Sequence, residues 1–311
     1  MRLAHSPALT ERFPLHSNQN GQSHWPVVRV LVAHDLHSGL GMRPEWGPMD
    51  GPDAVSEQEL LERALHRLPD GATVVGDSNF GVFSVAYAAA QANHPMVLRL
   101  TQARAQRLAG KTLTENMDRQ IVWKPSRDDR RSHPQLPEDA SVSGRLIVCQ
   151  IQPSNGAKPF LLSLFTTLPG TVAEILNLYG QRWNIETDVR TLKRDLSLHQ
   201  LTCATPDMAA KEIEMSIATY NLVRAMLCLA AQQSGNSPRD YGFTKARRIV
   251  QLFAPQIAAA GDQRQADRIF HQMMHYLQQA KLPKRRRKRP AYPRSVWARG
   301  ERFPARKAGT P

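Results

Sequence analysis

The stretch 179–193, YGQRWNIETDVRTLK, carries a pattern that bears on both the fold and the chemistry of the chain. An α-helix advances about 100° per residue, so Arg182, Glu186 and Lys193 fall within roughly 60° of Tyr179. The strip beside these four residues is apolar and consists of Leu178, Ile185, Val189, Leu192 and Leu196. The pattern predicts one helix, over 171–198, whose polar strip runs along the edge of its buried face.

The same spacing has a simpler explanation. A carboxylate with cations one turn away forms i,i+4 ion pairs, which are common on solvated helices and stabilise them by about 0.2–0.5 kcal/mol each. From this stretch alone, a surface ion pair and a functional site remain equally open. The rest of the chain has to decide between them.

Positive charge is concentrated at the C-terminus. The chain has 41 Lys and Arg against 27 Asp and Glu, a net charge of +14. Residues 281–311 hold 12 of these cations and one acid, Glu301, which makes +11 for this segment. Such a basic tail suits the phosphate backbone of DNA and predicts salt-dependent binding. RNA, acidic lipid or a localisation signal would fit the same composition.

The three cysteines, Cys149, Cys203 and Cys228, are widely spaced and form no CxxC pair. They indicate neither a disulfide framework nor a zinc site and fit a reducing compartment. The N-terminal sequence MRLAHSPALTERFP lacks the apolar core of a signal peptide. Because the sequence contains no run of about 18 apolar residues, no membrane span is expected. These features predict a cytoplasmic protein.

The order of predicted elements indicates an α/β fold. The elements are a loop over 1–26, an antiparallel strand pair over 27–36 and 38–47, a helix over 56–68, a strand over 72–77, a helix over 83–93, a strand over 95–100, and helices over 171–198, 206–233 and 244–280. Between them, 101–168 is polar, contains several prolines and is interrupted by strand-like pieces, which predicts a β-rich insertion.

This order resembles that of a ribonuclease-H-like, or retroviral-integrase-like, mixed sheet. The predicted units are 1–100 and 169–235 as the core, 101–168 as the insertion before the C-terminal catalytic helix, 236–280 as a helical region and 281–311 as the basic tail. That fold begins with three antiparallel strands, whereas the chain offers two before its first helix. We therefore expect the first strand to be missing.

Asp77 is the second candidate residue for chemistry, because it ends the buried strand ATVVGD and precedes a turn. Open α/β sheets place their sites at the carboxyl ends of strands, although Asp is also favoured in Asx turns and helix caps. Combined with the distant Glu186, Asp77 predicts a Mg²⁺ or Mn²⁺ site for phosphoryl transfer. Such sites use carboxylates from separate elements, with waters and substrate phosphate completing the ligands.

Two motifs carry a resemblance to a known family. VVGDSNFG (74–81) and LYGQRWNIETDVRTLKRDLSL (178–198) resemble the corresponding motifs of bacterial transposases of the insertion-sequence-four type, within the Asp-Asp-Glu transposase and integrase group. The second motif reproduces the family's Tyr-x2-Arg-x3-Glu-x6-Lys signature, with Trp183 in the usual Arg-Trp pair. The resemblance covers roughly residues 1–235, and the insertion and basic tail are also similar to the family.

The resemblance implies a role for each matching residue. Asp77 and Glu186 would be catalytic acids that bind Mg²⁺, or Mn²⁺ in its place. Tyr179, Arg182 and Lys193 would contact DNA phosphates near the transposon end, and Trp183 belongs to the same DNA-binding motif. The implied reaction is strand cleavage by water, followed by attack of the freed 3′-hydroxyl on double-stranded target DNA. The implied assembly is a homodimer in a synaptic complex on the bacterial nucleoid.

One departure from the family pattern concerns the first catalytic Asp. In the family it stands on the first strand, shortly before a polar segment like the one that opens this chain at Met1. We therefore expect that Asp to fall upstream of the start and the chain to be inactive alone. Asp35 is a poor substitute because it occupies the next strand. Two alternatives stay open: a non-catalytic DNA-binding remnant that inhibits a full-length copy, and a nuclease of the same fold.

Overall fold

The computed structural model describes residues 1–18, 21–110, 112–113, 116–153 and 158–283. Its helices are α1 (Pro7–Arg12), α2 (Glu57–Leu65), α3 (Phe83–Gln91), α4 (Gln102–Ala109), α5 (Arg127–Ser132), α6 (Val172–Gly180), α7 (Trp183–Asp195), α8 (Pro206–Gln233), the 3-10 helix η1 (Pro238–Asp240), α9 (Phe243–Ala258) and α10 (Gln263–Gln278). Its strands are β1 (Ser17–Asn18), β2 (Gly21–Gln22), β3 (Val28–Leu31), β4 (Glu45–Pro48), β5 (Val74–Gly76), β6 (Met96–Arg99), β7 (Met117–Trp123), β8 (Val142–Ile151) and β9 (Phe160–Thr166).

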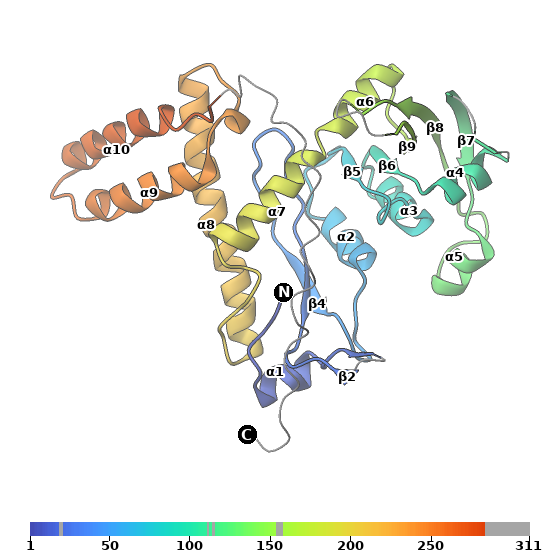
Figure 1. Ribbon diagram of the computed structural model, residues 1–311, viewed down its shortest axis with the longest axis horizontal. Helices are drawn as coiled ribbons and strands as arrows, with labels where there is room; N and C mark the ends of the chain where they lie inside the picture. The colour runs from blue at the N-terminus through green and yellow to red at the C-terminus, as the bar shows by residue number, and fades with distance from the viewer. Residues whose placement is uncertain (19–20, 111, 114–115, 154–157, 284–311) are drawn as a thin grey trace.

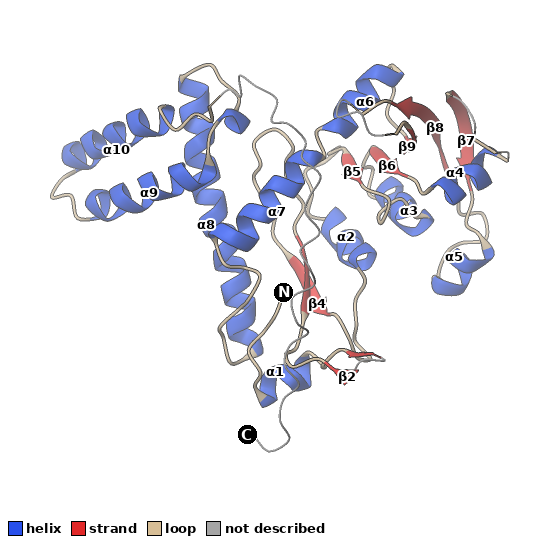
Figure 2. Ribbon diagram, viewed as in Figure 1, coloured by secondary structure: helices blue, strands red, loops and turns tan. Residues whose placement is uncertain are grey.

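The largest sheet has five strands in the order β5-β6-β9-β8-β7. β5 and β6 are parallel, and every other neighbouring pair is antiparallel. The sheet is therefore mixed, as the fold class predicted. Figure 2 shows these strands gathered in one part of the molecule and the long helices α8, α9 and α10 in another.

Both faces of this sheet are covered, because side chains alternate along each strand. Val97 and Leu164 face α6 and pack with its Ile175. Their neighbours Leu98 and Phe165 face the other way, into a core that includes residues of α3 and α4. The sheet therefore lies between helices. Its apolar strands β6 and β9 are central, and β5 is at one edge.

The strands within 101–168 join the large sheet. β9 pairs with β6 through Leu98↔Phe165, and β8 pairs with β9 through Leu146↔Phe165. The strands expected to form the insertion 101–168 thus extend the sheet that β5 and β6 begin. Which strands they would pair with could not be predicted, because strand pairing between distant segments leaves no local mark in the sequence. The polar, proline-containing stretch forms the short helix α5 and the loops around it.

The strand pair before α2 forms a small sheet of its own. β3 and β4 are antiparallel, with Val30 opposite Trp46, which confirms the predicted pairing. Among the described residues, neither strand is hydrogen-bonded to the five-stranded sheet. α2 follows with the predicted capping box, in which Ser56 Oγ accepts from Glu59 N and Glu59 Oε2 accepts from Ser56 N.

The N-terminal segment is more ordered than the predicted loop over 1–26. α1 begins with Ser6 as its N-cap and Pro7 in its first turn, where proline is tolerated. Leu9 and Phe13 lie four residues apart and are fully buried in the core that contains α8. The prolines of this segment were interpreted as loop signals, whereas one of them starts a helix.

A second core is formed by the C-terminal helices. α8 has the bounds predicted from the sequence, and its inner face packs with α1, α9 and α10. The helical segment predicted over 244–280 divides into α9 and α10, because Asp262 caps a new helix. These two helices lie side by side in Figure 1. The basic tail lies outside the described residues, apart from Lys281, Leu282 and Pro283.

Candidate active site

Asp77 directly follows β5 and shapes the turn that leads to α3. Its Oδ1 accepts a hydrogen bond from Asn79 N at 2.9 Å, so the Asx turn considered from the sequence is present. Its backbone carbonyl accepts from Phe80 N at 3.1 Å and Gly81 N at 3.0 Å. Gly81 packs so closely that a Cβ would meet Arg99 O at 1.9 Å. The turn therefore holds Asp77 at the carboxyl end of β5, where the residue is half-buried.

Two helices occupy the stretch predicted to form one (171–198). α6 ends at Gly180, and α7 begins at Trp183. Across the junction, amides bond three residues back, as Arg182 N does to Tyr179 O at 3.0 Å. Such bonds tighten the helix to about three residues per turn, and glycine is a weak helix former. The backbone stays helical, but the uniform angle of 100° per residue does not hold across the junction.

The structure buries one signature residue and leaves the others near the surface. Tyr179 lies on the inner face of α6, packed against strand residues of the five-stranded sheet. Arg182 is half-buried, while Trp183, Glu186 and Lys193 are exposed. The prediction that all four residues share one strip is therefore wrong for Tyr179. In the last turn of α6, the side that carries Tyr179 faces the sheet.

Arg182 links the signature residues to one another. Its Nη2 donates to Glu186 Oε1 at 3.2 Å. Its guanidinium carbon lies 5.8 Å from the Tyr179 ring centroid and 5.4 Å from that of Trp183. The i,i+4 ion pair of the simpler explanation thus exists. Because the Glu186 side chain is exposed, the pair contributes little to stability, and its presence does not exclude a functional role.

Two polar atoms of the motif are left without a partner. The Tyr179 hydroxyl and Arg182 Nε are buried, and no described residue hydrogen-bonds to either. An unsatisfied buried group costs about 1–3 kcal/mol, so such groups usually bind water or a ligand. A guanidinium is well suited to phosphate, which it contacts through parallel N–H donors. The motif therefore holds two polar groups that a bound water or anion would satisfy.

A cavity of about 520 Å³ separates β3 from β5 and reaches the α6–α7 junction. Gly76 at the end of β5 and Ile185 in α7 both line it. Asp77 and Glu186 directly follow these two residues in the sequence, but neither acid itself lines the cavity. Its lining consists of 31–37, Met42, Leu61, Leu68, Pro69, 72–76, Phe80, Leu178, Gln181 and Ile185.

Asp35 lines the same cavity, but its carboxylate is engaged elsewhere. Its Oδ1 accepts from Ser38 N and from Ser38 Oγ, both at 2.6 Å. Partial burial raises the pKa of Asp35, but the hydrogen bonds from Ser38, together with the charges of His37 and Arg239, lower it overall. Asp35 is therefore an ionised turn residue.

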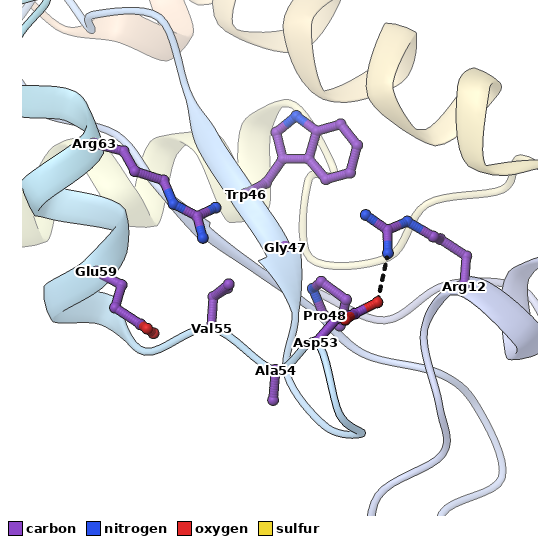
Figure 3. A pocket seen from close by; sticks show the side chains of 9 residues that line it. All are labelled: Arg12, Trp46, Gly47, Pro48, Asp53, Ala54, Val55, Glu59 and Arg63. Atoms are coloured by element: carbon purple, nitrogen blue, oxygen red, sulfur yellow. Dashed lines mark hydrogen bonds and ion pairs between the residues drawn. The ribbon is translucent and has the colours of Figure 1, made fainter. Parts of the chain in front are cut away.

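A smaller hollow of about 360 Å³ lies between α1, β4 and α2 (Figure 3). Arg12 Nη1 and Asp53 Oδ2 form an ion pair across it at 3.4 Å. Glu59 on its other side is held in the capping box with Ser56. Neither the two candidate acids nor the residues next to them in the sequence line this hollow, so it is unrelated to the candidate site.

A buried ionic network fixes α7 in place, and the sequence analysis missed it. Asp188 is fully buried, and both its oxygens accept from Arg239 Nη1 at 2.8 Å. It also accepts from Arg224 Nη2, on α8. Arg224 Nε donates to the Tyr220 hydroxyl, which donates to Gly39 O at 2.9 Å. The sequence signal for this network was Arg224, an arginine in the otherwise apolar middle of the helix predicted over 206–233.

The two candidate acids fit a metal ion that is shared with substrate. Asp77 and Glu186 supply hard carboxylate oxygens, and Mg²⁺ is commonly held by one or two carboxylates plus waters and phosphate. Within the described part of the chain, no group of three or more His, Cys, Asp or Glu residues is placed to hold a metal. The donor set therefore suits a joint site with a phosphate and does not suit a cage made of protein alone.

Comparison with known proteins identifies the class. Residues 6–222 match the family described as the transposase DDE domain, and because this match spans more than half of the chain, the chain belongs to that family. Among curated proteins, Transposase InsG for insertion sequence element IS4, from Escherichia coli strain K12, is 25% identical over 314 residues. The alignment covers 97% of this chain and 67% of the relative. The predicted transposase of the insertion-sequence-four type, with its link to DNA transposition and mobile elements, is confirmed.

Proposed function

We propose that the chain acts at the ends of an insertion sequence, where it cleaves DNA strands and joins them to target DNA with the help of a divalent metal. In this proposal Asp77 and Glu186 hold the metal, with Mg²⁺ as the expected ion and Mn²⁺ as a substitute. When bound, such a metal polarises phosphoryl oxygens and activates the attacking hydroxyl or water. We expect this activity in the cytoplasm, on the nucleoid.

The observation that supports the proposal is one cavity lined by the residues that directly precede both acids. Gly76 and Ile185 line it, and each directly precedes one of the acids. A surface ion pair between Arg182 and Glu186 does not by itself explain why residues next to both acids line one cavity at the end of β5. Open α/β sheets bind their ligands in that position.

The remaining signature residues support contact with the DNA backbone. Lys193 is exposed on the last turn of α7, and Trp183 is exposed on its first. Arg182 supplies a positive charge between Trp183 and Glu186. The buried Tyr179 takes a different part in the proposal, because its ring lies beneath the Arg182 guanidinium and holds it in place. The basic residues of 281–311 add sequence-independent affinity.

A further strand belongs, we infer, between β3 and β5. β3 is hydrogen-bonded only to β4 and β5 only to β6 among the described strands. The second edge of β5 is therefore free. The second edge of β3 is bonded at Val28, whose N–H donates to Met1 O at 2.9 Å and whose carbonyl accepts from the Met1 amino group at 2.7 Å. Both strands line the same cavity. α2 and the α6–α7 junction cover the two open sides of this cavity, as helices cover a central strand. Without that strand the catalytic centre has two acids, so we expect the 311-residue chain alone to give little strand transfer.

Metal-dependent binding of element-end DNA tests the proposal even if strand transfer is weak. We expect Mn²⁺ to tighten binding of the end DNA by the unmodified chain. Asp77→Asn and Glu186→Gln should abolish this gain and keep the metal-free affinity. Asp128→Asn, on the exposed surface of α5, is the matched control and should retain the gain.

The outcomes separate the proposal from its alternative. If both variants respond to Mn²⁺ as the unmodified chain does, the chain is a non-catalytic DNA-binding protein that competes for element ends. Robust strand transfer by the chain alone would contradict the inferred need for a further strand. Metal-dependent nicking of any DNA, with no preference for element ends, would indicate a nuclease.

A further inference from the structure

An apolar stripe runs along the outer face of α8. Met208, Met215, Leu222 and Leu229 follow one another at intervals of seven residues, and 52%, 64%, 52% and 39% of their surfaces are exposed. The opposite face of α8 is buried in the core with α9 and α10. Soluble proteins seldom expose a long apolar patch unless it binds something. We refer to these four residues as the α8 stripe.

The residues between the members of the stripe complete a heptad pattern. Each large side chain is followed three residues later by a side chain that is smaller or polar, and these are Lys211, Ala218, Ala225 and Gln232. Steps of three and four that repeat every seven residues are the seam of a coiled coil. The seam spans 208–232, about 36 Å at 1.5 Å per residue. α8 therefore presents a second, coiled-coil face in addition to its buried one.

We propose that the α8 stripe pairs with the α8 stripe of a second copy of the chain, in antiparallel orientation about a two-fold axis at the level of residue 220. In this register Met215 of one copy lies opposite Ala225 of the other, and Leu222 lies opposite Ala218. Large side chains thus meet small ones in each central layer, which lets the two helices interdigitate. The interface is isologous, as two-fold symmetry requires.

The charges on α8 favour this orientation over a parallel one. In a parallel pair the two Lys211 side chains would meet in one layer, and like charges at an interface are strongly unfavourable. In the antiparallel pair Lys211 lies opposite Leu229 and can extend its ammonium group to solvent. The exposed ion pair between Arg43 and Glu214, at 2.9 Å, then forms part of a polar rim.

A second copy also explains the stripe better than a lipid bilayer does. By length and composition α8 could cross a membrane, since its most apolar 18-residue window has a mean hydropathy of 1.2. However, 39% of that window is buried in the protein, and Arg224 ties the helix to Asp188 inside the core. α8 is therefore a core helix, and its outer face is a surface stripe. Pairing through this stripe is independent of the chemistry at Asp77 and Glu186.

Sedimentation equilibrium of the full chain, in high salt and free of DNA, tests the pairing. We expect a concentration-dependent dimer. Leu222→Lys should raise its dissociation constant by about 100-fold or more, because each dimer buries the new charge twice. The matched control is Leu252→Lys on α9, whose leucine is 63% exposed and lies off the stripe. It should leave the constant unchanged, and circular dichroism should show that both variants are folded.

Charge pairing tests the register. Met215→Lys and Ala225→Glu should each prevent homodimers, and a mixture of the two variants should form heterodimers. If heterodimers form instead from a mixture of Met215→Lys and Met215→Glu, the two helices are parallel and the proposed orientation is wrong.

Other outcomes overturn the second copy as the partner. One is a chain that stays monomeric at high concentration, and another is a dimer that Leu222→Lys does not affect. Dimerisation only after deletion of 284–311 would also overturn it. So would binding to lipid vesicles by a monomer, if Leu222→Lys abolishes that binding.

Discussion

Asp188 accepts hydrogen bonds from Arg239 Nη1 on both of its carboxylate oxygens, each at 2.8 Å, with no surface of Asp188 exposed. The bonds tie α7 to the 3-10 helix that follows α8. Glu186 lies two residues earlier on the same helix and is exposed. The buried acid therefore sets the rotation of α7, and with it the direction in which Glu186 projects.

Replacing Asp188 should weaken the fold severely. Asp188→Asn leaves the buried Arg224 and the half-buried Arg239 without a counter-charge, and removing one partner of a buried pair costs about 3–5 kcal/mol. Urea unfolding followed by circular dichroism measures the loss. Glu186→Gln is the matched control, because its ion pair is exposed and should change stability by less than about 1 kcal/mol. Equal effects of the two variants would contradict the assigned difference between the buried and the exposed acid.

His34 should make the fold sensitive to acid. Burial lowers the pKa of His34 below its ordinary value of 6.5; Asp188 and the carbonyl of Gly39 oppose this effect, while Arg239 and Arg224 add to it. The unfolded chain therefore takes up this proton at a higher pH than the folded chain does. The stability from neutral His34 is complete above pH 6.5 and falls as the pH drops toward the folded pKa.

Urea unfolding at a series of pH values checks this expectation. The free energy of unfolding should fall between pH 7 and 5 in the unmodified chain, and the slope should be smaller in His34→Gln, whatever that variant's stability at pH 7. A variant with an unchanged slope would show that His34 is not the titrating group.

Local rules predicted the elements that depend on a few neighbouring residues. Ser56 and Glu59 form the capping box of α2, and Thr205 with Pro206 starts α8 where the sequence indicated. These signals work because the donor, the acceptor and the helix end lie within one turn. The placement of Asp77 after a strand followed in the same way.

Features that depend on tertiary packing could not be predicted in this way. Nothing near β9 indicates that Phe165 will pair beside Leu98, so the sequence does not reveal that the strands of 101–168 extend the large sheet. Tyr179 was assigned to the polar strip, although its ring fits the apolar face of α6. The partners of Asp188 come from two later elements. In each case the deciding contact is distant in sequence.

Lys193 should contribute to DNA affinity through charge alone. Lys193→Ala removes one exposed cation from α7, so the slope of log affinity against log salt should fall by about 0.9, the value for one phosphate contact on duplex DNA. Fluorescence anisotropy with element-end and unrelated duplexes measures both slopes. Lys245→Ala is a control on α9, where the lysine already donates to Gln279 O at 3.0 Å. A slope that stays unchanged in Lys193→Ala would exclude the proposed contact.

The free edge of β5 should be visible in hydrogen exchange. β6 lies between β5 and β9, whereas β5 is hydrogen-bonded only to β6 among the described strands. Amides of β5 should therefore exchange much faster than those of β6, because exchange follows local opening. Mass spectrometry of peptides covering 72–77 and 95–100 compares them. Equal protection would mean that the edge of β5 is already covered in the free chain, which would contradict the inferred vacant strand position.

Gly180 and Gly81 should respond in opposite ways to replacement by alanine. A Cβ on Gly180 would meet nothing within 4 Å, whereas one on Gly81 would meet Arg99 O at 1.9 Å. Gly180→Ala should therefore stabilise the chain by about 0.5–1 kcal/mol through improved helix propensity at the end of α6. Gly81→Ala should destabilise it by more than that, because the strand after α3 must move and Asp77 moves with the turn. Thermal unfolding measures both changes. If Gly180→Ala also weakens DNA binding, the tightened junction is needed to orient Arg182. The break between α6 and α7 would then favour function at some cost in stability.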